Sequence, residues 1–372
     1  MSLSDQSPQH DLSRRAFVKS ALGAAVAAGV GPTILRAGET RMNATTETGR
    51  PLIIGSGQHT YQVIDEWAKL PSGKKFGNTH GVCETADGRI FIHNASPTGD
   101  CVCEFDPQGK FIRSWGKEYS PGAHGMQLRT EGGEEFLYFA TTSNHTCAKT
   151  DLKGERVFGL EYPKDARNAK GEPCYADDDK KPAAAKYSPT NIAFAPGDNG
   201  GDFYVADGYG SNYIHQYNGK GEYIRTWGGT GTDVGQLRCP HGIWCDTRDP
   251  SKPQLVVADR SNVRLQYFTL DGQYVSTISH ELRAPCHFDQ RNGELLIPDL
   301  HGRLTIFDKD NKLVIHLGDN PNPKLRGNNA VPQDELRPGV FCSPHQAIWD
   351  RAGDIYVVEW LKYGRVTKLQ RA

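Results

Sequence analysis

Histidine recurs at one fixed position of a segment that repeats six times along the chain. Each copy opens a short apolar run after a turn containing proline or glycine. The shared position is occupied by His80, His124, Thr190, His241, Cys286 and His345. The copies are 44 to 66 residues apart, which is the size of a four-stranded β-propeller blade with its loops. The repeat therefore predicts six blades closed into a ring.

The rest of each unit also indicates β-structure. A second apolar run follows the first, and near-continuous apolar runs are typical of strands buried on both faces. These runs cover residues 89–94, 136–141, 202–207, 255–259, 295–299 and 354–359. A polar strand, a turn with glycine or asparagine and a last strand come next, most clearly at 102–115 and 217–227. With 41 Gly, 22 Pro and no sustained helical periodicity, the chain is expected to be all-β.

The two ends of the chain predict how the ring closes. The sixth unit stops at residues 365–370 and lacks a last strand of its own. Residues 62–67, near the start, match residues 110–115 of the first unit. An N-terminal strand can therefore complete the last blade and remove an exposed sheet edge. We expect a six-bladed propeller over residues 41–372, with the polar stretch 165–181 as a surface excursion.

Residues 1–40 are typical of an export signal. The stretch 13–19 is a twin-arginine motif with Arg14 and Arg15, and an apolar run follows from Ala21 to Leu35. The run contains Gly31 and Pro32 and is short for a membrane span, which favours cleavage over a permanent anchor. The mature protein is therefore expected to be periplasmic or secreted.

Charge and cysteine content exclude several other classes. With 43 Lys+Arg against 44 Asp+Glu, no global field attracts nucleic acid or an anionic membrane. The nine cysteines show neither a disulfide framework nor a paired zinc signature. We expect a small-molecule or peptide substrate in the central channel, no nucleic acid and no stable membrane insertion, with a protein partner left open.

The histidine column predicts a metal site. The first strand of each propeller blade lines the central channel, so equivalent positions on these strands form a ring about the axis. His124, His241 and His345 belong to alternate blades, and three neutral imidazoles suit zinc with a fourth position open. His80 belongs to the same column and is expected to be a fourth ligand, a neighbour of the ligands or a substrate contact.

Two further residues at the same end of the channel are candidates for catalysis. A phenol near a metal and an arginine has a stabilised phenolate, so Tyr209 could act as a general base. Arg260 could hold a carboxylate through two hydrogen bonds. For each residue taken alone, ordinary packing in a turn is an equal alternative.

At these residues the chain resembles the NHL-repeat propellers, and among them the peptidyl-α-hydroxyglycine α-amidating lyases. The resemblance rests on 123–126, 240–242 and 344–345 for the histidine motifs, 207–209 for the tyrosine turn and 258–260 for the arginine. It implies a six-bladed propeller with a zinc ion held by His124, His241 and His345. The implied reaction is cleavage of a peptidyl-α-hydroxyglycine to a peptide amide and glyoxylate. Tyr209 and Arg260 would be the active-site residues.

Two features depart from that family. The family has an aspartate after the third histidine, where it helps to bind calcium, and this chain has Gln346. A neutral amide in place of a charged ligand argues against calcium. The family's cysteines at the tyrosine and arginine loops are absent here, because Gly210 and Val256 occupy those places.

The leading hypothesis is an exported zinc-dependent lyase acting on an α-hydroxyglycine-type C–N bond. One alternative is a propeller metallohydrolase resembling a lactonase, although such enzymes usually hold their metal through Glu, Asn and Asp. The other is a non-enzymatic NHL-repeat module that binds a protein or glycan on one rim. The second alternative predicts no stoichiometric metal.

Overall fold

The protein is almost entirely β in the part described by the computed structural model, which is residues 44–45, 49–97, 99–197 and 200–372. Helical structure within these residues is limited to four short 3₁₀ turns: η1 (Lys117–Tyr119), η2 (Ala183–Lys186), η3 (Arg260–Asn262) and η4 (Gln333–Glu335). The proposed export signal lies outside the described residues. No helix among the described residues is both long and apolar enough to cross a membrane.

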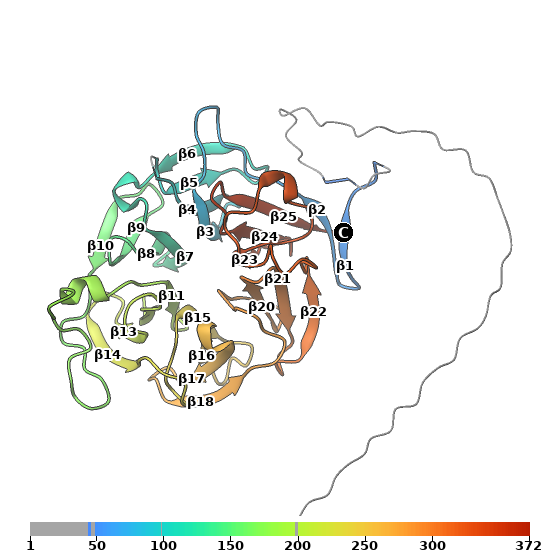
Figure 1. Ribbon diagram of the computed structural model, residues 1–372. Helices are drawn as coiled ribbons and strands as arrows, with labels where there is room; N and C mark the ends of the chain where they lie inside the picture. Colours follow the sequence, from blue (N-terminus) through green and yellow to red (C-terminus); the bar gives the residue numbers. More distant parts are fainter. Residues whose placement is uncertain (1–43, 46–48, 98, 198–199) are drawn as a thin grey trace, which may run out of the picture. The chain divides into compact units, whose positions relative to one another are not determined.

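Six antiparallel sheets surround a central axis, which confirms the predicted six-bladed propeller (Figure 1). Blade 1 contains β3 (Asn78–Glu84), β4 (Ile90–Ala95), β5 (Val102–Phe105) and β6 (Phe111–Trp115). Blade 2 contains β7 (Ala123–Glu131), β8 (Glu134–Thr141), β9 (Thr146–Asp151) and β10 (Arg156–Leu160). Blade 3 contains β11 (Asn191–Phe194), β12 (Phe203–Ala206), β13 (Tyr213–Tyr217) and β14 (Tyr223–Gly228).

The second half of the ring repeats this order. Blade 4 contains β15 (Pro240–Asp246), β16 (Gln254–Asp259), β17 (Arg264–Phe268) and β18 (Tyr274–Ile278). Blade 5 contains β19 (Asp289–Arg291), β20 (Glu294–Asp299), β21 (Arg303–Phe307) and β22 (Leu313–Leu317). Blade 6 contains β23 (Pro344–Trp349), β24 (Ile355–Glu359) and β25 (Arg365–Arg371).

Blade 6 is completed from the other end of the described chain, as the sequence predicts. Strand β2 (His59–Ile64) pairs with β25, and Val63 lies opposite Leu369. The structure adds one strand that was not predicted, β1 (Ile53–Ser56), which pairs with β2 and makes this sheet five-stranded. The ring is thus closed by hydrogen bonds between segments from opposite ends of the propeller sequence.

A buried ion-pair cluster supports the same closure. The Arg365 guanidinium on β25 contacts Asp65, which follows β2, at 2.9 Å and Glu359 on β24 at 3.0 Å. Arg365 and Glu359 are buried, and Asp65 is nearly so. Because Arg365 is the partner of both carboxylates, removing its guanidinium leaves two buried negative charges without compensation.

The apolar core is divided among the blade interfaces. One cluster joins blades 1 and 2 through Phe91, Val102 and Phe139, and another joins blades 5 and 6 through residues such as Leu296 and Trp349. The second strands β4, β8, β12, β16, β20 and β24 are buried along most of their length. This burial on both faces accounts for their continuous apolar runs.

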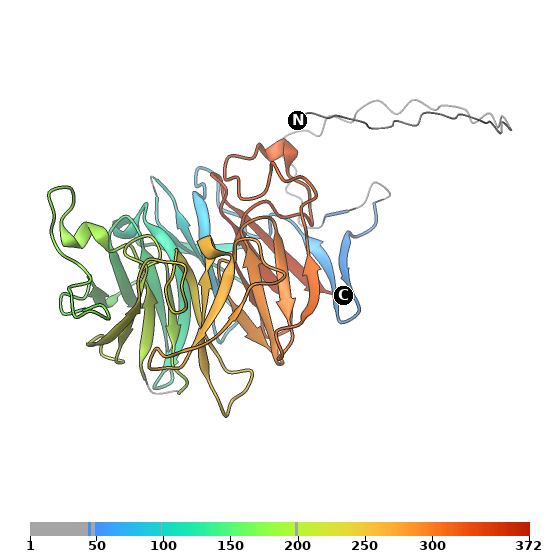
Figure 2. The same ribbon diagram turned by 60° about the horizontal axis from the view of Figure 1, so that its bottom comes forward.

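The long connections stand on one face of the ring, the face that also carries the start of each inner strand. Figure 2 shows this face uppermost, with the connections around η2 and η4 projecting from it. The stretch 165–181 is mostly exposed, as expected, but it is more than a surface excursion. Its Tyr175 is only 6% exposed and packs against blade 3.

Candidate metal centre

Four inner strands begin with a β-bulge at the predicted histidine. The pairing register shifts across His80 in β3, His124 in β7, His241 in β15 and His345 in β23. A bulge inserts an extra residue into one strand and re-aims its side chain. The four imidazoles therefore leave the plane of their sheets at the mouth of the channel.

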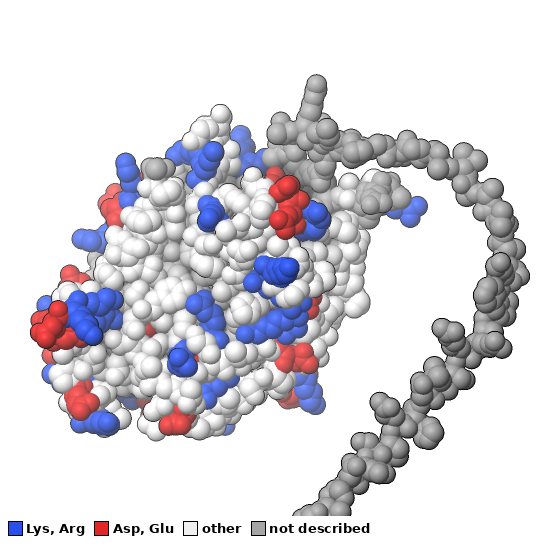
Figure 3. All heavy atoms as spheres, viewed as in Figure 1, with Lys and Arg blue, Asp and Glu red and all other residues white. Residues whose placement is uncertain are grey.

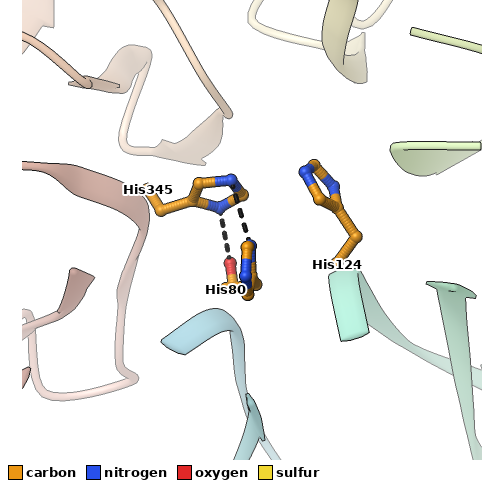
Figure 4. Close-up of side chains that lie close together, drawn as sticks. All are labelled: His80, His124 and His345. Atoms are coloured by element: carbon orange, nitrogen blue, oxygen red, sulfur yellow. Dashed lines mark hydrogen bonds between the residues drawn. The ribbon is translucent and has the colours of Figure 1, made fainter. Parts of the chain in front are cut away.

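The structure brings all four predicted histidines together on the axis. The ring centre of His124 lies 4.6 Å from that of His241, 4.7 Å from that of His345 and 5.1 Å from that of His80. The His345 ring lies 4.6 Å from His241 and 4.5 Å from His80. Figure 4 shows three of these side chains pointing toward one another from blades 1, 2 and 6.

Three of the imidazoles are anchored in the same way. The Nδ1 of His124 bonds the carbonyl of Thr190 at 2.6 Å, that of His241 bonds Cys286 at 2.9 Å, and that of His345 bonds His80 at 2.9 Å. Each acceptor occupies the same repeat position in the next blade. Because Nδ1 must donate its proton to the carbonyl, Nε2 is left as a lone pair, the usual tautomer of a metal-bound histidine.

A glycine makes two of these anchors possible. Gly125 follows His124 and Gly242 follows His241, and both strands pass very close to the next blade. A Cβ on Gly125 would lie 2.5 Å from the Thr190 carbonyl oxygen, and one on Gly242 would lie 2.4 Å from the Cys286 carbonyl oxygen. These are the same oxygens that accept the histidine protons. The His-Gly pairs in the sequence are therefore a packing requirement of the anchor.

His80 is held differently. Its Nδ1 lies 3.3 Å from Nε2 of His345, the contact drawn as a dashed line in Figure 4. For His80, the equivalent anchor in the next blade would be the carbonyl of His124. That carbonyl instead accepts a hydrogen bond of 3.0 Å from Nδ1 of His93. His80 therefore does not share the anchor of the other three and donates to a lone pair of one of them.

The cluster consists of neutral imidazoles. Burial lowers the pKa of His124 to about 3, and burial also holds the pKa values of His80, His241 and His345 well below the ordinary value. Nε2 of His124 is buried and has no hydrogen-bond partner among the described residues. Neutral nitrogens with free lone pairs are what zinc and similar ions require.

The spacing of the ligand atoms fits a metal ion. One ligand atom each from His80, His124 and His345 lies within 4.8 Å of the others. A tetrahedral zinc with bonds of about 2.0–2.1 Å separates its ligands by roughly 3.4 Å, so a small contraction is sufficient. This group contains His80, whereas the common anchor singles out His124, His241 and His345. His241 is not part of this group, although its ring lies 4.6 Å from the rings of His124 and His345.

Tyr209 and Arg260 lie against this cluster. The Tyr209 hydroxyl is 3.1 Å from Nε2 of His241, to which it donates, and it accepts a bond of 3.2 Å from Arg260. Tyr209 is 46% exposed at the mouth, while its hydroxyl points inward. Desolvation raises the pKa of Tyr209 to about 12, and the charge of Arg260 opposes that rise. In this arrangement Tyr209 is a neutral donor.

Arg260 has no carboxylate partner within ion-pair distance in the described part of the chain. Its other contacts are the thiols of Cys239 at 3.3 Å and Cys286 at 3.8 Å. All nine cysteines lie within the described residues, and all are free thiols. A largely enclosed guanidinium whose side-chain neighbours among the described residues are neutral is chemically suited to hold an anionic group.

The sequence analysis missed a set of carboxylates that position the site. In blades 3 to 6, an acidic residue stands at the end of the second strand or directly after it. Its carboxylate accepts a hydrogen bond from a backbone N–H of the segment that leads into the inner strand of the same blade. The bonds are Asp207 with Ser188, Asp259 with Arg238, Asp299 with Arg283, and Glu359 with Cys342, each at 2.6 Å. The recurrence of an acid at the end of the second apolar run was the signal that could have identified them.

Asp207 belongs to a buried network that reaches the long insertion. Its Oδ2 accepts from the Tyr175 hydroxyl at 2.7 Å and from the Ser211 backbone at 2.6 Å. The Tyr175 oxygen lies 2.7 Å from Nε2 of His215, whose Nδ1 lies 2.8 Å from the Thr226 hydroxyl. Because Ser211 follows Tyr209 by two residues, this network fixes the turn that carries Tyr209.

Gln346 occupies the place where the resemblance implied a calcium ligand. Its amide nitrogen donates to the carbonyls of Val82 at 2.9 Å and Met126 at 3.1 Å. Its amide oxygen is buried without a partner among the described residues. A cation here would break both bonds and would find only neutral oxygens on these three residues. The residues present therefore do not fit calcium at this position.

Fold and site together define a six-bladed propeller with an axial histidine cluster, and sequence comparison adds known relatives. The chain is 32% identical over 209 residues to peptidyl-glycine alpha-amidating monooxygenase A of Xenopus laevis, covering 53% of this chain and 20% of that protein. It is 31% identical over 206 residues to peptidyl-alpha-hydroxyglycine alpha-amidating lyase 1 of Drosophila melanogaster, covering 51% of this chain and 34% of that protein. The chain thus spans about a third or less of the length of these relatives. The predicted resemblance to amidating enzymes is confirmed at this level.

Comparison with solved structures supports the fold. Virginiamycin B lyase from Staphylococcus aureus, in a catalytically inactive form with quinupristin, superposes with a TM-score of 0.51. The match covers 83% of this chain and 99% of that protein at 11% identity, so it shows the propeller fold alone. No family model matches the chain.

Proposed function

We propose that the protein is a metal-dependent lyase that cleaves the C–N bond of an α-hydroxyglycine-type substrate to an amide and glyoxylate. The observation that carries the proposal is one compact group of side chains. It consists of a cluster of neutral histidines, a tyrosine bonded to it and an arginine that has no carboxylate partner among the described residues. The name of the Drosophila melanogaster relative includes this activity, and the site has the chemical groups that it needs.

His124, His241 and His345 would hold the ion through Nε2, with His80 as a fourth ligand or as a neighbour of the ligands. The ion would take the Nε2 lone pairs that face His80 and Tyr209 in the structure. Zinc is the best fit to an all-imidazole set. When bound, it would supply a Lewis acid for the substrate oxygen. The Nδ1 bonds to backbone carbonyls would keep each ring oriented, an arrangement whose loss typically costs about 10–100-fold in metal affinity.

Arg260 would bind the substrate carboxylate. Its guanidinium is positioned by Tyr209 and two neutral thiols, and a carboxylate would give it the anionic partner that it lacks. This contact would place the hydroxyl-bearing carbon above the histidine cluster. A substrate without the carboxylate should therefore bind poorly.

Tyr209, as its phenolate, would take the proton of the substrate hydroxyl. The C–O bond then becomes the carbonyl of glyoxylate, the C–N electrons go to nitrogen, and Tyr209 passes the same proton to that nitrogen, which gives the amide and restores the phenolate. Desolvation raises the pKa of Tyr209, while Arg260 lowers it. The arginine that holds the carboxylate thus also favours the phenolate that acts as base.

The test is glyoxylate release from N-acyl-α-hydroxyglycine, measured together with metal content. Replacing His241 by alanine should abolish both stoichiometric metal and turnover. Replacing the exposed Lys220, on the opposite face of blade 3, should change neither. Full turnover by metal-free His241→Ala protein would refute the proposal. Hydrolysis of lactones in place of glyoxylate release would support the hydrolase alternative, and an absence of metal in the purified protein would support a binding module.

We also propose that residues 1–40 direct twin-arginine export and that residues 41–372 form the mature propeller. The support is the sequence of residues 13–35. Cell fractionation should find the protein in the periplasm or medium, and the change of both Arg14 and Arg15 to lysine should retain it in the cytoplasm. Unchanged export of that variant would reject the twin-arginine route.

A further inference from the structure

A cavity lies at the junction of blades 1 and 6, on the face of the ring where the inner strands begin. It encloses about 420 Å³ and lies outside the histidine cluster. Its wall includes Phe76, two residues before β3, and Lys362, in the connection between β24 and β25. The same two blades supply His80 and His345 to the cluster, so the cavity and the candidate metal centre share one blade interface.

The lining of the cavity is apolar at its base and positive at its rim. Leu70 and Phe76 are partly buried, and Lys74, Lys75 and Lys362 are exposed around the opening. Asp100 is the acidic side chain in the lining, and it pairs with Lys74 at 3.7 Å. Lys75 and Lys362 have no carboxylate within ion-pair distance in the described part of the chain.

The space-filling view agrees with this charge distribution. Figure 3 shows Lys and Arg side chains around the centre of this face, and Asp and Glu mostly toward its edge. Positive potential at the mouth attracts anionic ligands and falls with ionic strength. The rim lysines of the cavity can therefore select a ligand by charge.

The order of the blades gives the direction of a bound substrate. Arg260 belongs to blade 4, which lies across the ring from blade 1 (Figure 1). If the substrate carboxylate lies on Arg260 and the reacting carbon lies above the histidines, the remainder of the substrate extends toward blades 1 and 6. This places its N-terminal part over the cavity.

We infer that this cavity binds the acyl part of the substrate and that the preferred substrates are peptides with acidic side chains before the hydroxyglycine. The inference rests on the proposed lyase function for the direction of the chain. Phe76 and Leu70 take up the aliphatic part of such a side chain, and Lys75 and Lys362 pair with its carboxylate.

The test uses acetylated tri-glutamyl and tri-lysyl peptides ending in α-hydroxyglycine. The full-length protein should have a kcat/KM roughly tenfold higher for the glutamyl peptide, through KM, and the preference should shrink at high salt. The double variant Lys75→Glu, Lys362→Glu should reverse the preference in kcat/KM. The matched control Lys220→Glu, on the opposite face, should keep the wild-type ratio.

Binding separates this inference from the proposed function. Both peptides can be made with a C-terminal glycine in place of α-hydroxyglycine, which the enzyme cannot cleave. Calorimetry then measures their binding affinity whether or not turnover occurs. Tighter binding of the glutamyl form, lost in the double variant, supports the inference even if no glyoxylate is released. Equal affinity for both forms, or a preference that the double variant keeps, overturns it. Turnover of both peptides at equal kcat/KM overturns it while leaving the lyase function intact.

Discussion

At the scale of single residues, the site depends on how closely two backbones approach. Gly242 allows β15 to lie against the segment of Cys286, and His241 uses that approach to anchor Nδ1. The same relation holds for Gly125, His124 and Thr190. The glycine is thus needed because it lets the neighbouring blade come close enough to bond the histidine, and not because of its own backbone angles.

Replacing Gly242 by alanine should weaken both the fold and the metal site. The new Cβ would meet the Cys286 oxygen at 2.4 Å and His287 Cα at 2.8 Å, which forces the blades apart. We expect a loss of about 1–3 kcal/mol in unfolding free energy and a metal affinity roughly tenfold lower or weaker still. Denaturant unfolding and chelator competition measure these two quantities.

Gly159→Ala is the matched control, because a Cβ there meets nothing closer than 3.7 Å and the residue lies in β10 at the outer edge of blade 2. Both variants should bind metal equally if the anchor has no role in orienting His241. That result would contradict the interpretation.

At the scale of elements, an insertion between blades 2 and 3 stabilises the turn that carries Tyr209. Tyr175 links this insertion to Asp207 and His215 through two buried hydrogen bonds. Burial raises the pKa of Asp207 to about 7, and the N–H groups of Ser188 and Ser211 and the Tyr175 hydroxyl oppose the rise. A fully bonded network of this kind holds one arrangement of the turn.

Tyr175→Phe should leave the buried Nε2 of His215 without a partner and remove one of the hydrogen bonds to Asp207. The expected cost is about 1–3 kcal/mol of unfolding free energy, and kcat should fall because the turn that carries Tyr209 is no longer held in one arrangement. Thermal unfolding and steady-state kinetics measure the two effects. Tyr162→Phe, which removes a neighbouring hydroxyl that bonds to no described residue, should be close to wild type. Wild-type kcat in the Tyr175 variant would show that the network has no role in positioning.

At the scale of the whole molecule, the buried histidines make stability depend on pH. Burial lowers the pKa values of seven histidines: His80, His93, His124, His215, His241, His287 and His345. Below the unfolded pKa of about 6.5, the unfolded chain binds protons that the folded protein does not. Stability therefore falls as pH decreases from about 6.5, by up to about 1.4 kcal/mol per pH unit for each histidine.

Buried carboxyls act in the opposite direction. Burial raises the pKa values of Asp207 and Asp289 to about 7 and also raises that of Asp299, so the folded protein binds their protons more strongly than the unfolded chain. The seven histidines outnumber them, and the net expectation is a melting temperature that drops steeply between about pH 6.5 and 5. Calorimetry across this range tests the prediction, and a constant melting temperature would contradict it.

The sequence by itself determined the number of blades, the strand that closes the ring and the column of histidines. These features are local and periodic: a strand, a turn and a bulge are encoded within a few residues, and repetition makes the pattern visible. It also singled out Tyr209 and Arg260, because each lies in a loop after the second apolar run, at the same end of the channel as the histidines.

Only the tertiary structure decided what those residues touch. The Nδ1 anchors join neighbouring blades, Gln346 bonds carbonyls of blades 1 and 2, and Tyr175 reaches Asp207 from an insertion that looked like a surface loop. The extra strand β1 and the cavity beside Lys75 likewise depend on ring closure. Such contacts join residues that are 32 to 264 positions apart. Their geometry follows from how closely the blades pack, which no local pattern encodes.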